Sequence, residues 1–72
     1  MTVPREEAYR WAVALYRAYC SRYGCEPLET DPVLSRIGKK YVYLRGAEGS
    51  VARVDMVACK VIAALVGCRV VP

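Results

Sequence analysis

Apolar residues recur every three to four positions between Ala8 and Tyr23, which predicts an amphipathic helix near the N-terminus. A residue at 2–3 can cap such a helix, Pro4 suits its first turn, and Gly24 supplies a left-handed stop. The apolar arc of this helix is wider than the ~100° stripe that faces a single core. We therefore expect the helix to contact both its own sheet and a second copy of the chain, and the residues predicted for that interface are Trp11, Leu15, Tyr16, Tyr19 and Tyr23.

Residues 38–55 alternate between aliphatic and polar or aromatic side chains, which predicts a β-hairpin. A three-residue loop over 47–49 would place Gly49 at the left-handed position of a common hairpin turn. This register puts aliphatic pairs on one face (Val42 with Val54, Leu44 with Ala52). The other face would carry Tyr41 opposite Asp55, Tyr43 opposite Arg53 and Arg45 opposite Val51. A slip of one residue would mix the two faces, so the pattern favours this register.

The remaining segments are shorter or more ambiguous. Residues 30–38 contain a capping residue, a proline and a closing glycine around one apolar turn, which predicts a short helix. Residues 56–66 are apolar almost all round; Asp55 and Gly67 suit the ends of a helix, whereas the β-branched residues favour a strand. We expect a buried helix there, followed by a short final strand over 68–72. The chain is thus predicted to form a single small α+β domain over 1–72 with one antiparallel sheet.

The chain has 72 residues, and 56% of them are hydrophobic. A chain this short buries only about 60% of its unfolded surface, so a disulfide, a metal or a partner chain is a common supplement. No apolar run approaches the ~20 residues of a membrane span, and the N-terminus lacks the features of a secretory signal. We expect a cytoplasmic protein that does not enter a membrane and that presents an apolar surface to another protein.

The sequence contains no Asn, no Gln and no His, and eight of its 11 basic residues are Arg. Scarcity of thermolabile amides is typical of proteins from thermophiles. The absence of His removes the commonest general base and zinc ligand. The chain also lacks a nucleophile elbow and a phosphate-binding glycine loop. We therefore expect neither an enzyme nor a cofactor, and no small-molecule substrate is evident.

Four cysteines allow disulfides, free buried thiols or a zinc site: Cys20, Cys25, Cys59 and Cys68. Their spacing lacks the paired knuckles of ordinary zinc modules. Intracellular proteins of hyperthermophiles do form disulfides, so these cysteines do not imply secretion. If 56–66 were helical, Cys59 and Cys68 would lie too far apart to bridge, and a bridge between them would indicate a second hairpin.

The hairpin face that points away from the aliphatic residues is aromatic and basic. Tyr41 and Tyr43 can stack with bases, and basic residues beside them can hold phosphates. The segment KKYVYLRG resembles the basic and aromatic strand of RNA-recognition domains over that one strand, although Val42 replaces the small residue of that pattern and a second aromatic strand is absent. The predicted nucleic-acid contacts are Lys39, Lys40, Tyr41, Tyr43, Arg45 and Arg53.

The net charge of +4 favours an anionic partner. We expect a small basic protein that binds RNA or DNA, or belongs to a ribonucleoprotein, and that forms a homodimer. The alternative is a structural module that dimerises or docks on a larger complex without binding nucleic acid. Exposed tyrosines on the hairpin favour the first hypothesis, and tyrosines buried against a partner favour the second.

Overall fold

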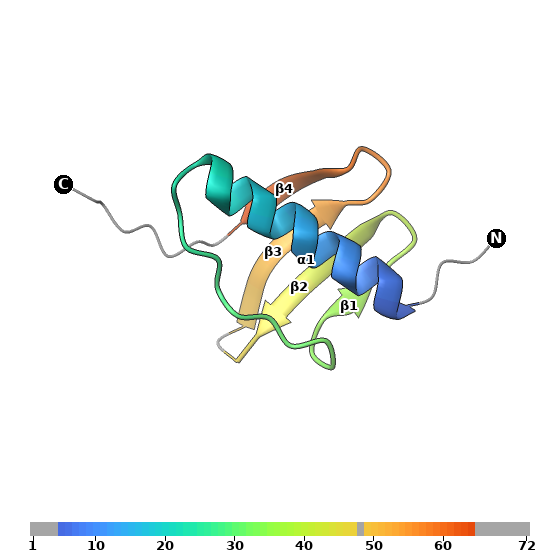
Figure 1. Cartoon of the computed structure of the whole chain (residues 1–72). Helices are drawn as coiled ribbons and strands as arrows, with labels where there is room; N and C mark the ends of the chain where they lie inside the picture. The colour runs from blue at the N-terminus through green and yellow to red at the C-terminus, as the bar shows by residue number, and fades with distance from the viewer. Residues whose placement is uncertain (1–4, 48, 65–72) are drawn as a thin grey trace.

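The computed structural model describes residues 5–47 and 49–64 and shows one helix packed on one face of a four-stranded antiparallel sheet (Figure 1). The elements are α1 (Arg5–Arg22), β1 (Arg36–Ile37), β2 (Tyr41–Gly46), β3 (Gly49–Asp55) and β4 (Lys60–Ala64). The strands lie in the sheet in the order β1-β2-β3-β4. This architecture confirms the α+β class.

Helix α1 ends where the sequence predicts. Gly24 adopts a left-handed conformation with φ of 68°. The backbone N–H of Cys25 donates to the carbonyl of Cys20 at 2.8 Å, and the N–H of Gly24 donates to that of Ser21 at 3.4 Å. These two bonds form a Schellman motif, which satisfies carbonyls that the helix end leaves unpaired.

The core lies between α1 and the sheet. Ala12, Tyr16 and Cys20 form the buried stripe of the helix, and they pack against Val42, Leu44, Val51, Ala52 and Val54 of the sheet. The Tyr16 hydroxyl accepts a hydrogen bond from the backbone N–H of Leu28 at 2.9 Å, which ties the connector after α1 to the core. The helix therefore contacts its own sheet, as its wide apolar arc predicts.

The central hairpin has the predicted register along most of its length. Tyr41 pairs with Asp55, Val42 with Val54, Tyr43 with Arg53, and Leu44 with Ala52. A β-bulge then shifts the pairing, so that Arg45 lies opposite Ser50 instead of Val51. The bulge turns Val51 into the core, so the expected pairing of Arg45 with Val51 is wrong. Gly46 pairs with Gly49, so the three-residue loop is wrong too, although Gly49 does have a positive φ, of 110°.

The short helix expected over 30–38 is not formed. Asp31 organises a single turn, in which its carboxylate accepts from the N–H of Val33 and its carbonyl accepts from that of Ser35. Ser35 is buried, and its hydroxyl accepts from the N–H of Arg45 at 3.0 Å. This anchor to β2 sets the next residues beside that strand, where they form β1.

The helix expected over 56–66 is also wrong for the part that the structure describes. Residues 56–59 form a turn, and β4 follows it and pairs with β3. The segment forms a strand because its β-branched residues favour an extended backbone and because the backbone groups along the edge of β3 are available for hydrogen bonds. The strand expected over 68–72 and the cap expected at residues 2–3 lie outside the described residues.

Candidate nucleic-acid interface

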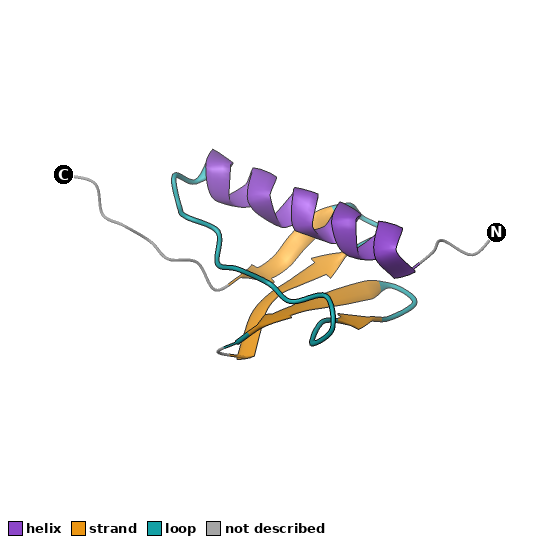
Figure 2. Ribbon diagram, turned by 60° about the horizontal axis from the view of Figure 1, so that its bottom comes forward, coloured by secondary structure: helices purple, strands orange, loops and turns teal. Residues whose placement is uncertain are grey.

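The helix covers only one face of the sheet, and no described segment covers the other (Figure 2). We call this second face the open face. Strand alternation and the pairing register assign its residues, because Val42, Leu44 and Val54 point toward α1 and their neighbours point away. The open face comprises Arg36, Tyr41, Tyr43, Arg45, Ser50, Arg53, Asp55, Lys60 and Ala63.

Four of these residues form one row across all four strands. Arg36 on β1 pairs with Tyr43 on β2, which pairs with Arg53 on β3, which pairs with Ala63 on β4. Directly opposed residues on one face have Cβ atoms about 4.5 to 5.5 Å apart. The register therefore places Tyr43 between two arginines on the neighbouring strands, and Tyr43 is 37% exposed.

Tyr41 occupies the next row and is more enclosed. Its ring centre lies 5.3 Å from the Lys40 Nζ and 5.7 Å from the guanidinium carbon of Arg53. The Tyr43 ring is tilted against it, with centroids 6.4 Å apart. These cation–π distances are within the range that stabilises such pairs, so the two cations and the two rings form one packed cluster.

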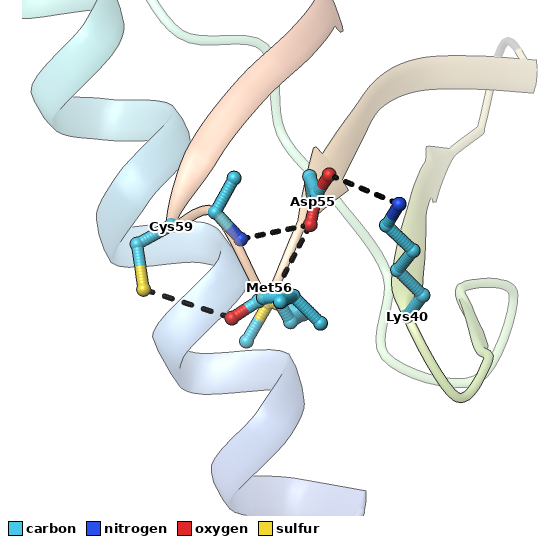
Figure 3. Close-up of polar contacts among 6 residues, drawn as sticks. Lys40, Asp55, Met56 and Cys59 are labelled. Atoms are coloured by element: carbon cyan, nitrogen blue, oxygen red, sulfur yellow. Dashed lines mark hydrogen bonds and ion pairs between the residues drawn. The ribbon is translucent and has the colours of Figure 1, made fainter.

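Asp55 is the acidic member of the same region, and its carboxylate has two structural tasks (Figure 3). Its Oδ1 accepts from the N–H groups of Val57 and Ala58, both at 2.9 Å, and so organises the turn that leads into β4. Its Oδ2 lies 3.9 Å from the Lys40 Nζ. The hydrogen bond from Ala58, with that from Val57 and the charges of Lys40 and Lys60, lowers the pKa of Asp55. Asp55 therefore stays ionised, and the open face is positive on balance because four basic residues lie on it, Arg36, Arg45, Arg53 and Lys60.

The structure brings most of the predicted contact residues together. Tyr41, Tyr43, Arg45 and Arg53 lie on the open face, and Lys40 borders it. Lys39 does not join them, because it lies in the β1–β2 turn and lines a groove on the helix side of the sheet. Two further cations reach the open face, Arg36 and Lys60, and the sequence patterns missed them because both lie in segments expected to be helical.

The five helix residues predicted to form an interface differ in how exposed they are. Tyr16 lies in the core of its own chain, with 1% exposed, and we leave it out of any interface. Leu15 and Tyr19 are half-buried, and the Tyr19 and Tyr23 rings are in contact. Trp11 is 59% exposed and lines the groove between α1 and the two neighbouring turns, together with Ala8, Ile37, Val42 and Met56.

The three cysteines that the structure describes form no disulfide with one another. Cys20 is buried, Cys25 is half-buried and Cys59 is exposed. Cys68 lies outside the described residues, so a bridge to it is untested. Cys59 lies in the turn between β3 and β4, and β4 then leads away from it in an extended conformation.

No helix in the described part of the chain is long and apolar enough to cross a membrane. No protein-family model matches the sequence, and no curated protein or solved structure is significantly similar to it.

Proposed function

We propose that the chain binds nucleic acid through the open face of its sheet. The observation that supports this proposal is the row of Arg36, Tyr43 and Arg53, in which an exposed tyrosine pairs with an arginine on each neighbouring strand, on a face that no described segment covers. Arg45 and Lys60 extend the positive charge along the same face, and Lys40 extends it at the border. A planar surface with several cations suits a polymer that carries one negative charge per residue.

Binding of this kind is mainly electrostatic and weakly sequence-specific. Arginines on a sheet can neutralise phosphates in any sequence, whereas discrimination of adenine commonly uses Asn or Gln, and this chain has neither. Contacts with phosphates release counterions, so the affinity should fall steeply as salt concentration rises. The net charge of +4 predicts a moderate slope.

The test is fluorescence anisotropy of labelled single-stranded RNA, single-stranded DNA and duplex DNA, titrated with the full chain at several salt concentrations. The double variant Arg45→Ala/Arg53→Ala should bind more weakly and show a flatter salt dependence, because it lacks two phosphate contacts. The matched control is Arg10→Ala/Arg17→Ala, which removes the same charge from exposed positions on α1. Unchanged affinity in the first variant, or no binding by the natural chain at low salt, would overturn the proposal.

A second candidate function is a protein-interaction module that uses the helix side, most simply to form a homodimer. The exposed Trp11 beside an apolar groove supports it, because Trp is enriched at the centre of protein interfaces. Val57, which is 74% exposed, lies in the turn next to this groove. The two functions are compatible, because they use opposite faces of the sheet.

Trp11 also separates the two functions experimentally, because it is the only tryptophan of the chain. A ligand on the open face should leave the emission of Trp11 unchanged, whereas a partner on the helix side should shift it. Sedimentation of the natural chain and of Trp11→Ala tests the dimer. A dimer that Trp11→Ala converts to a monomer supports the second function, and a natural chain that stays monomeric at high concentration contradicts it.

A further inference from the structure

The two tyrosines of the open face differ in what surrounds their rings. Lys40 and Arg53 both lie near the Tyr41 ring, at 5.3 Å and 5.7 Å from its centre. Among the described side chains no cation lies over the Tyr43 ring, although the register places an arginine on each side of it. Tyr41 is therefore already engaged by the protein, whereas Tyr43 has a ring that a ligand can contact.

A hollow of about 510 Å³ lies beside Tyr43 on the sheet. Its lining includes Tyr43, Ser50, Arg53 and Ala63. Ala63 is the last residue of the row that begins at Arg36. Its side chain is short, whereas the other three residues of the row have long side chains, so the surface is recessed at Ala63. The rest of the lining is apolar and comes from Val51, Ala52 and Ala64, so the hollow combines one aromatic ring, one hydroxyl and one guanidinium with small aliphatic residues.

We infer that Tyr43 is a stacking platform for an unpaired nucleobase, and that the open face is therefore selective for single-stranded over duplex nucleic acid. The inference rests on the proposed function and specifies its substrate class. A base on the Tyr43 ring would occupy the hollow, and Arg36 and Arg53 would lie on either side to hold the flanking phosphates.

Single strands fit this arrangement because their bases are free to leave the stack. In a duplex the faces of the bases are covered by their neighbours, so a ring on a sheet can reach them only after the bases unpair and unstack, which is energetically unfavourable. Stacking of one base on an aromatic side chain is worth about 5- to 150-fold in affinity. The chemistry is shared by RNA and DNA, and the experiment needs both.

The test compares four labelled probes of equal length with the full chain: single-stranded RNA, single-stranded DNA, an abasic single strand and a duplex. The abasic strand keeps the phosphates and lacks the bases. The variants are Tyr43→Leu, which keeps an apolar side chain suited to a strand, and Tyr43→Phe, which keeps the ring. Tyr23→Leu is the matched control, because Tyr23 is also exposed and lies at the end of α1.

The natural chain, Tyr43→Phe and Tyr23→Leu should bind a base-containing single strand at least about 5-fold more tightly than the abasic strand or the duplex. Tyr43→Leu should bind the base-containing single strands no more tightly than the natural chain binds the abasic strand. Equal binding of the base-containing and abasic strands by the natural chain would overturn the stacking role and leave the electrostatic function intact. Binding of none of the probes would overturn both. A preference between RNA and DNA would show whether the sugar is also contacted.

Discussion

The guanidinium carbon of Arg53 lies 5.7 Å from the centre of the Tyr41 ring, although the register pairs Arg53 directly with Tyr43. The arginine thus leans along β2 toward the neighbouring tyrosine. Its position has two consequences: it leaves the Tyr43 ring open to a ligand, and it brings the charge of β3 next to that of Lys40. The electrostatics and the aromatic surface of the open face are therefore coupled through one side chain.

Arg36→Ala should weaken nucleic-acid binding, although sequence patterns alone do not point to this residue. The register places Arg36 beside Tyr43, and removal of one phosphate contact reduces the slope of log affinity against log salt by about 1. Anisotropy titrations over a salt series measure this slope. Arg17→Ala, on the exposed side of α1, should leave the slope unchanged, and a variant of Arg36 that behaves like this control would exclude β1 from the site.

Stability should fall in acid because of Asp55. The folded pKa of Asp55 is lower than its ordinary value of 3.8, so the unfolded chain binds a proton more readily. The stabilisation is fully present above about pH 4 and is lost as the pH falls through the folded pKa. Urea unfolding at a series of pH values should show this loss in the natural chain and a shallower one in Asp55→Asn. Parallel pH profiles for the two proteins would contradict the role of this carboxylate.

Gly46→Ala should destabilise the fold through a steric clash. Gly46 is buried in β2, and a Cβ atom built there would run into the backbone carbonyl oxygen of Glu29. The adjacent connector is held to β2 by a hydrogen bond from the N–H of Asp31 to the carbonyl of Arg45, at 2.7 Å. Since backbone must move, we expect a loss of about 1 to 3 kcal/mol in the free energy of unfolding.

Urea or thermal unfolding of the Gly46 variant measures this loss. The exposed Ser50 on β3 provides the control, because Ser50→Ala should change stability by no more than about 0.5 kcal/mol. Equal stabilities for Gly46→Ala and the natural chain would show that the backbone of Glu29 does not lie against Gly46.

Tyr16→Phe should destabilise the fold without opening a cavity. The substitution removes the hydroxyl that accepts the N–H of Leu28 at 2.9 Å, and a donor left without its partner away from water costs about 1 to 3 kcal/mol. Burial also raises the pKa of Tyr16 above 10.0. The natural chain should therefore lose stability as the pH rises through this folded pKa, because ionisation is easier in the unfolded chain.

Unfolding at neutral and at alkaline pH tests both statements, and Tyr23→Phe is the control because Tyr23 is 63% exposed. The Tyr16 variant should be the less stable protein at neutral pH and should show a weaker decline in alkali. A stability equal to that of the natural chain would contradict the role of this hydroxyl.

Local patterns in the sequence are sufficient to predict where α1 ends and which residues pair along most of the central hairpin. Gly24 and the residues around it form a stop that needs no distant contact. The alternation over 41–44 and 52–55 leaves only one pairing that separates aliphatic from polar side chains. For this reason the sequence by itself places Tyr41, Tyr43, Arg45 and Arg53 on one face of the hairpin.

Tertiary contacts decided the two flanking segments. Residues 30–38 carry helix signals, yet Ser35 is buried and accepts a hydrogen bond from the backbone of Arg45, which places the residues after it along the edge of β2. Residues 60–64 have no period that separates helix from strand, and the free edge of β3 makes them a strand. These pairings join residues that are distant in the sequence, so only the folded chain could add Arg36 and Lys60 to the open face and place Ala63 beside Tyr43.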